Sequence, residues 1–283
     1  MTQPILTRPL LTRMAPAALL LLGTALAGCD GSSMQINDQD GVPLSEIEIA
    51  GPPPSEIVLA SGDTVIVKDG DTFAITVEGP NTDSLRFVRD ERTIGIMREE
   101  GWDGPNNATI RITMPPPKTV VIAGAGTIQA QSLATESDVS IGGTGDITFG
   151  TIAAEKLGIN IGGNGTIKGA GTVKSLEITI GGNGEVEMPG LKADKAEVTI
   201  GGAGDIAFAS DGEVEATIAG AGDINVAGNA KCTVNAFGSG TLNCTPTSAG
   251  ASAAIPAPDQ VAAPTAPAAP KAPAAPVAAK PAQ

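Results

Sequence analysis

The sequence contains no histidine and no tyrosine, and its aromatic residues, one tryptophan and five phenylalanines, make up 2% of 283 residues. Without histidine, the chain cannot build histidine-dependent catalytic triads or the commonest zinc sites. Glycan-binding sites usually stack sugars on aromatic rings, so the shortage of rings argues against a tight lectin-like site. Basic residues are also scarce, because 17 Lys and Arg face 31 Asp and Glu, for a formal net charge of −14. This balance argues against binding to nucleic acid or to anionic lipid surfaces.

Arg111 is the last arginine of the chain, so the regular coils contain none. Polysaccharide lyases on β-helical folds use basic residues beside carboxylates, and the regular coils offer no arginine for that role. A glycosidase would need only two carboxylates at a suitable separation, but no phrase singles out such a pair and no aromatic subsite flanks one. We therefore predict a protein that is not an enzyme and needs no cofactor. A carbohydrate-active enzyme, either a glycosidase or a lyase, is the alternative.

Glycine is abundant, with 37 residues, and much of it lies in one phrase that occurs seven times. Each copy is an apolar residue, a short glycine cluster and another apolar residue, as in Ile161-Gly162-Gly163-Asn164-Gly165-Thr166-Ile167. The last glycine of the copies falls at 126, 145, 165, 184, 204, 222 and 240, so subtraction gives spacings of 19, 20, 19, 20, 18 and 18 residues. So regular a period, with no helical segment between copies, indicates stacked coils of strand.

Between the glycine phrases, apolar and polar residues alternate, as in Leu176, Ile178 and Ile180 with Glu177 and Thr179 between them. A period of two is typical of a strand with one buried face. A single repeat cannot bury that face, whereas stacked repeats form a continuous core. We therefore predict an all-β, single-stranded parallel β-helix with a narrow aliphatic interior, in which Ile161, Ile180 and Ile200 stack in one inward column.

The β domain is expected to span residues 44–245. From 44 to 113, alternating apolar pairs are separated by turn signals such as Asp69-Gly70-Asp71, without the glycine phrase. We interpret this part as irregular N-terminal coils of the same domain. Residues 246–283 are almost wholly alanine and proline, so they are predicted to be a disordered tail.

Residues 1–28 have the layout of a signal sequence, with arginines first and a short apolar core after them. The segment ends in Leu26-Ala27-Gly28-Cys29, which resembles the lipobox of bacterial lipoproteins. That resemblance implies cleavage before Cys29 and attachment of a lipid to it. The stretch after it is polar and contains glycine, and it is predicted to be a tether over residues 29–43. The alternative is an ordinary secretory peptide with a chance cysteine. The resemblance also implies the periplasmic side of a bacterial membrane, and Asp30 favours the inner membrane.

The position after each glycine phrase is expected to form an outward column on the stacked coils. Its members are Thr127, Asp146, Thr166, Glu185, Asp205, Asp223 and Thr241. The acidic members Asp146, Glu185, Asp205 and Asp223 could bind a cation weakly, but solvated turn residues are the favoured interpretation, and we predict no metal site. A second column, before the phrase, is predicted to be a ladder of small polar side chains without chemistry: Ser140, Asn160, Thr179, Thr199, Thr217 and Asn235.

Two cysteines besides Cys29 fall at the C-terminal end of the repeats. By phase, Cys232 takes the inward position of Val214, and Cys244 takes that of Val226. These two columns are expected to meet at one corner of the coil, so a Cys232–Cys244 disulfide is predicted to pin the last coil shut. The alternative is a pair of buried free thiols.

The chain resembles the GIN domain, a family named as the head domain of an autotransporter adhesin. The resemblance rests on Ser61-Gly62-Asp63-Thr64-Val65, on the segment from Ala108 to Pro115, and on the repeated Ile-Gly-Gly-x-Gly-Asp-Ile phrases. It covers about residues 44–245 and does not include the tail. It implies a right-handed parallel β-helix on secreted or membrane-anchored bacterial proteins, with no defined biochemistry.

Together these features predict a lipid-anchored envelope protein whose rigid β-helix presents a surface for adhesion or protein contact. Its expected partners are the membrane, through Cys29, and another envelope or surface protein, with no nucleic acid. A purely structural envelope spacer is the other non-catalytic interpretation.

Overall fold

The computed structural model describes residues 35–246. The predicted signal sequence, the predicted lipidation site Cys29, Asp30 and all but the first residue of the predicted tail lie outside the described residues. Two short 3-10 helices, η1 (Leu44–Glu46) and η2 (Thr82–Ser84), accompany sixteen strands. The strands are β1 (Glu56–Leu59), β2 (Thr64–Asp69), β3 (Ala74–Glu78), β4 (Leu85–Arg89), β5 (Thr93–Arg98), β6 (Thr109–Met114), β7 (Thr119–Ile122), β8 (Thr127–Ser132), β9 (Glu136–Ile141), β10 (Asp146–Ile161), β11 (Thr166–Ile180), β12 (Glu185–Ile200), β13 (Asp205–Ile218), β14 (Asp223–Ala227), β15 (Lys231–Ala236) and β16 (Thr241–Thr245).

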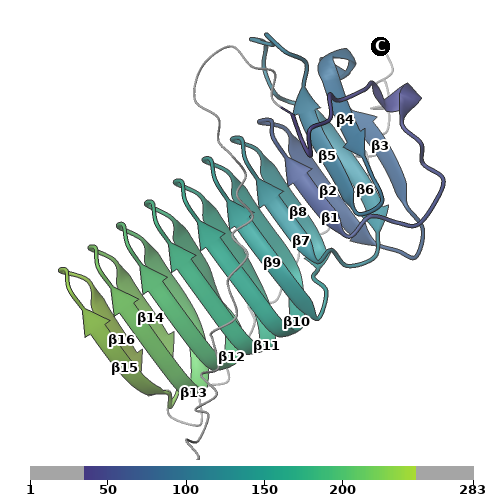
Figure 1. The fold of residues 1–283 in the computed structure, drawn as a ribbon. Coiled ribbons are helices and arrows are strands. Elements are labelled where there is room, and N and C mark those ends of the chain that lie inside the picture. The colour runs from purple at the N-terminus through teal and green to yellow at the C-terminus, as the bar shows by residue number, and fades with distance from the viewer. Residues whose placement is uncertain (1–34, 247–283) are drawn as a thin grey trace, which may run out of the picture.

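From β7 onward the chain winds into a parallel β-helix, seen in Figure 1 as a row of stacked coils. Every strand pair between β7 and β16 is parallel. The register holds from coil to coil, so that Ile161 lies beside Ile180, and Ile180 beside Ile200. The predicted all-β parallel β-helix is confirmed.

The interior is the predicted aliphatic core. Ile161, Ile180 and Ile200 are at most 1% exposed, whereas Thr179, between two inward residues, is exposed. Alternation along each strand therefore sends every second side chain into one continuous core, which is what a stacked repeat needs in order to be stable.

The glycine phrases form the tight turns that join two faces of each coil. A Cβ atom built on Gly165 would lie 2.5 Å from the carbonyl oxygen of Gly145, one coil below. On Gly163 it would overlap the carbonyl oxygen of Gly143. By contrast, the nearest atom to a Cβ on Gly162 is 4.0 Å away. The last two glycines of the phrase are thus required because backbones meet there, while the first faces open space.

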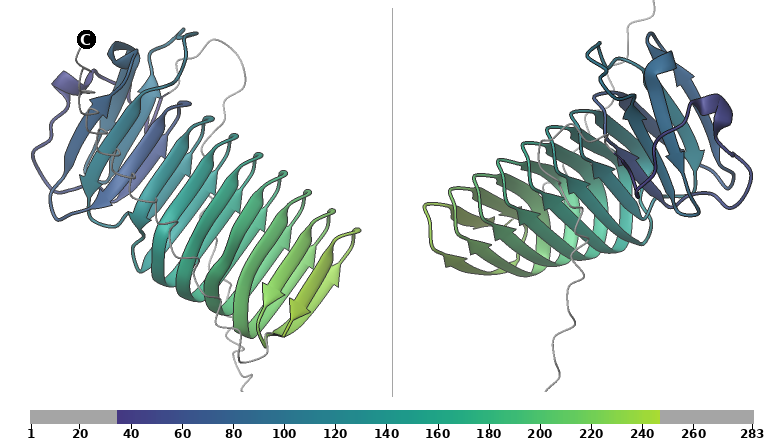
Figure 2. Two further views of the ribbon diagram at one scale, coloured as in Figure 1. Left: turned by 180° about the vertical axis from the view of Figure 1, so that it is seen from behind. Right: turned by 45° about the horizontal axis from the view of Figure 1, so that its top comes forward.

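At the N-terminal end the order in space departs from the order in sequence. Strand β1 lies between β5 and β7, and β2 lies between β6 and β8, so the later coil β5–β6 sits outside the earlier one. Strand β3 pairs with β6, and β4 with β5, both antiparallel. Figure 2 shows these strands at the end of the β-helix opposite β15 and β16. Within the predicted irregular coils, strands β3 to β6 therefore form a cap over the first coil, which consists of β1 and β2.

The structure differs from the prediction of a tether over residues 29–43. In the described part of that segment, Val42 and Phe87 exchange backbone hydrogen bonds of 2.9 and 2.8 Å. The side chain of Ile36 is 7% exposed and packs with Val88 and Met97. Two apolar residues in a polar stretch are thus enough to dock it against β4. No helix in residues 35–246 has the length and apolar character needed to cross a bilayer.

Candidate functional site

The predicted acidic column exists as a row of neighbours on successive coils. Asp146 lies beside Thr166, Thr166 beside Glu185, and Glu185 beside Asp205. Asp223 continues the row and lies beside Thr241. All four acidic members are exposed, as expected of an outward column.

Hydrogen bonds along this column tie its carboxylates to the next coil. Asp205 accepts a 3.1 Å bond from the backbone N–H of Asp223, and Asp223 accepts a 2.6 Å bond from the hydroxyl of Thr241. Burial and the neighbouring Glu187 raise the pKa of Glu185. Within residues 35–246, no three His, Cys, Asp or Glu side chains are grouped so as to hold a metal ion. The interpretation of the column as solvated turn residues, with weak cation binding as its alternative, stays a prediction.

A second acidic column lies on another face of the coils, and the sequence analysis missed it. Glu177 lies beside Glu197, and Glu197 beside Glu215, on three successive coils, and all three side chains are exposed. Within the described residues, only Glu177 has an ion-pair partner, the Nζ atom of Lys156 at 3.9 Å. The repeat period would have revealed this column, because its members come two residues before the polar ladder.

The polar ladder is also present, since Asn160 lies beside both Ser140 and Thr179. Ion pairs between coils surround these columns, for example Lys174–Glu155 and Lys192–Asp211, each at 2.6 Å. The hydrogen bond between Lys174 and Glu155 lowers the pKa of Glu155 and raises the pKa of Lys174. Such exposed pairs add little stability. The regular coils therefore present flat faces of repeated polar side chains.

The last coil carries the predicted disulfide. Cys232 lies beside Val214, and Cys244 beside Val226, as the phase predicted. The two cysteines are bonded across a Cα–Cα distance of 6.7 Å. The prediction of a bond rather than two free thiols is confirmed.

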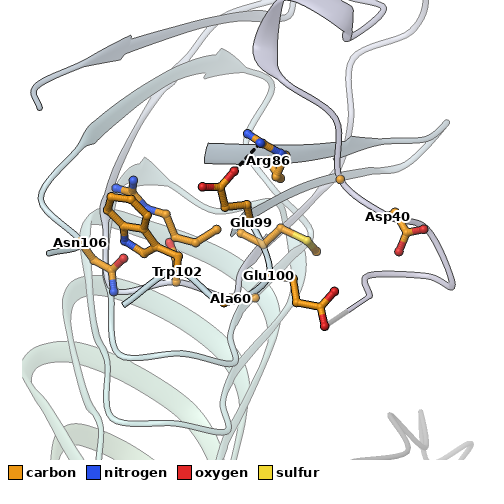
Figure 3. A pocket seen from close by; sticks show the side chains of 12 residues that line it. Asp40, Ala60, Arg86, Glu99, Glu100, Trp102 and Asn106 are labelled. Carbon is orange, nitrogen blue, oxygen red and sulfur yellow. Dashed lines mark hydrogen bonds and ion pairs between the residues drawn. The ribbon is translucent and has the colours of Figure 1, made fainter. Parts of the chain in front are cut away.

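A pocket of about 490 Å³ opens at the cap, beside the long loop that joins β5 to β6 (Figure 3). Sequence analysis gave no indication of it, because it depends on how the cap folds back. The charged and aromatic side chains around it are Asp40, Arg86, Arg98, Glu99, Glu100 and Trp102.

A buried ion pair lies beneath this pocket. Asp63 is fully buried, and it accepts hydrogen bonds from Ser61 Oγ at 2.8 Å, Ala108 N–H at 2.9 Å and both Nε and Nη2 of Arg98. Arg98 also donates to the hydroxyl of Ser84 at 2.6 Å. These bonds join the first coil to the cap. Asp63 directly precedes β2, and the last glycine of each phrase directly precedes the strand that follows it. A charged residue at this glycine position was the one feature of the sequence that could have indicated a special role for Asp63.

The arginines of the pocket are fully engaged by the protein. Arg86 donates to the carbonyl oxygens of Asp83 and Leu85, each at 2.8 Å, and pairs with Glu99 at 2.6 Å. The guanidinium of Arg98 lies over the ring of Trp102, 5.4 Å from its centre. The polar groups left facing solvent are mainly carboxylates, and the two arginines bind groups of the protein itself.

Comparisons with known proteins agree with this fold. Residues 53–230 match the family model described as "Putative auto-transporter adhesin, head GIN domain". No curated protein matches the chain.

Solved structures with the same fold come from Bacteroides and Parabacteroides species. A "putative adhesin" from Bacteroides fragilis is 19% identical with a TM-score of 0.63, and the match covers 68% of this chain and 93% of that one. A "putative lipid binding protein" from Parabacteroides distasonis is 20% identical with a TM-score of 0.54, covering 70% and 94%. A "putative adhesin" from Parabacteroides merdae is 18% identical with a TM-score of 0.52, also covering 70% and 94%. At these identities the likeness establishes the fold alone.

Proposed function

Because this chain belongs to the family described as "Putative auto-transporter adhesin, head GIN domain", we propose that it is a non-catalytic, lipid-anchored protein of the bacterial cell envelope. Its β-helix presents a rigid face for adhesion or for contact with another envelope protein. The anchor is Cys29, whose lipid and acyl chains hold the protein at a membrane. Asp30 favours the periplasmic face of the inner membrane.

The observation that carries this proposal is the stacked column of Glu177, Glu197 and Glu215. Neighbouring strands are about 4.8 Å apart, and like charges directly opposite each other destabilise a sheet. A simple spacer would gain stability from alternating charges or neutral residues at these positions. A column of carboxylates, two of them without an ion-pair partner in the described residues, is better explained as a surface for a basic partner.

The other interpretations have less support. A lyase would need a free basic residue beside its carboxylates, but Arg86 and Arg98 at the pocket are held by the protein's own groups. Lipid binding, which the name of one structural neighbour mentions, would need an apolar cavity. The pocket here is lined by five charged side chains: Asp40, Arg86, Arg98, Glu99 and Glu100.

The test is cross-linking in intact envelopes, with the lipidated protein as bait. We expect one or a few specific envelope partners, and we expect capture to weaken as salt is raised, because exposed charges are screened. Cys29→Ser should stay uncleaved or leave the membrane fraction. A bait that cross-links to nothing above background would favour the spacer instead, and normal processing and membrane partitioning of Cys29→Ser would refute the anchor.

A further inference from the structure

The two ends of the β-helix are built differently. At the N-terminal end, the antiparallel strands β3 and β4 cover the outermost coil. At the other end, β15 pairs only with β13, and β16 only with β14, among the described residues. Figure 1 shows this last coil standing at the edge of the stack. An open strand edge offers unpaired N–H and C=O groups, which proteins usually protect with charge, proline or a covering element.

The open end is apolar. Val234, an inward residue in the last coil, is 45% exposed because no coil lies above it. Phe237 is 82% exposed, the highest value among the large hydrophobic residues described. The backbone N–H of Phe237 donates to the carbonyl oxygen of Ile218 in the coil below. Ala219 and Gly201 make the equivalent bonds in earlier coils, to the carbonyl oxygens of Ile200 and Ile180, so the three residues occupy the same position of the turn. The turn position that is glycine or alanine in earlier coils is therefore a phenylalanine only in the last one.

The open end also lacks the negative charge of the rest of the chain. After Asp223, residues 224–246 contain no Asp or Glu, and Lys231 is their one charged residue. The coil before it carries Asp205, Asp211, Glu213 and Glu215. Two copies of an acidic protein repel each other through most of their surface, but not through this end.

We propose that the terminal coil is a docking surface for the terminal coil of a second copy of this chain. A two-fold axis across the open end sets β15 antiparallel to the partner's β15. The free N–H and C=O groups of each strand edge then pair with those of the other. Phe237 and Val234 then bury their apolar surface in the same contact. Aromatic anchors of this kind commonly dominate the energy of an interface. This inference does not depend on the proposed function.

The chain's own C-terminal segment is less suited to this place. A coil takes 18 to 20 residues, by the spacing of the glycine phrases, but only the nine residues 247–255 separate Pro246 from Pro256. Prolines follow at short intervals after that, and each lacks the N–H needed to pair with a strand edge. This spacing of prolines is poorly suited to a further full coil.

The experiment compares the full chain without its signal sequence with two single variants by sedimentation equilibrium. Phe237→Glu puts a charge on the open end, whereas Ala219→Glu puts the same charge at the matching exposed turn one coil earlier. We expect the parent and Ala219→Glu to dimerise with rising concentration, and Phe237→Glu to dimerise at least about tenfold more weakly. Hydrogen exchange of the β15 amides should slow as the dimer forms.

A parent chain that stays monomeric, or a dimer that Phe237→Glu leaves unchanged, would overturn the proposal. A monomer whose β15 amides are protected at every concentration would place the chain's own segment on this end. A monomer that gains β15 protection only with another envelope protein would make that protein the occupant. Either result would also overturn the proposal.

Discussion

The buried pair Asp63–Arg98 should hold the cap on the β-helix, and Arg98→Met tests this directly. In the structure, the side chains of Arg98 and Asp63 are 6% and 0% exposed. The methionine keeps most of the volume of the arginine but leaves the carboxylate of Asp63 buried without its counter-charge. The carboxylate of Asp63 still accepts hydrogen bonds from Ser61 and Ala108, but neither donor carries a positive charge.

Removing one partner of a buried ion pair typically costs about 3–5 kcal/mol, because the other charge stays desolvated. With a urea dependence of a few kcal/mol per M, this loss lowers the midpoint of unfolding by about 1–2 M. The double variant Asp63→Gly/Arg98→Met removes both charges. We expect it to recover much of the loss, since the last glycine of the other phrases occupies the matching position, as Gly126 does.

The assay uses Trp102, the one tryptophan of the sequence. Its ring lies under the guanidinium of Arg98, so its fluorescence reports the cap, while circular dichroism reports the strands of the whole β-helix. In Arg98→Met, the fluorescence transition should come at lower urea than the dichroism transition. Arg111→Met, which removes the exposed pair with Glu78, should change stability by less than about 1 kcal/mol. If Arg98→Met behaves like this control, the buried pair does not hold the cap.

Three further predictions concern the coils. Ile180→Ala should lower the free energy of unfolding by about 2–5 kcal/mol, because a close-packed core cannot collapse around the hole. Thr179→Val, on the outward face, should change it little. Equal losses for the two variants in urea denaturation would mean that the inward and outward positions are misassigned. Gly163→Ala should prevent correct stacking, because its Cβ would overlap the carbonyl oxygen of Gly143, whereas Gly162→Ala should fold normally. Comparable melting temperatures for those two alanine variants would contradict the close approach of backbones. Millimolar calcium should leave the melting temperature unchanged, whereas a rise of many degrees, reversed by chelator, would mean that the acidic column binds the ion.

The regular coils could be predicted from sequence because all their information is local and repeated. The spacing of the glycine phrases fixes the length of a coil, and the alternation around Ile178 fixes which side chains point inward. The same phase, carried to the last coil, placed Cys232 and Cys244 correctly. Each coil pairs with its neighbour in the same way, so one correct register gives the rest.

The cap could not be predicted in this way, because its pairings are not local and occur once. Nothing in the sequence indicates that β5–β6 lies outside β1–β2, or that Arg98 reaches Asp63 across 35 positions. The docking of Ile36 and Val42 was missed for a related reason. The segment around them is mostly polar and contains glycine, and this composition outweighed two apolar residues whose partners lie on β4 and β5.

The central claim is that the protein acts through a flat face of its β-helix and not through the pocket at the cap. The direct measurement repeats the envelope cross-linking with two variants that each remove exposed carboxylates. The face variant carries Glu177→Gln, Glu197→Gln and Glu215→Gln, and the pocket variant carries Asp40→Asn and Glu100→Gln. If the flat face binds the partner, the face variant loses the captured partner and the pocket variant keeps it. Loss of the partner in the pocket variant, with full capture by the face variant, would contradict the account.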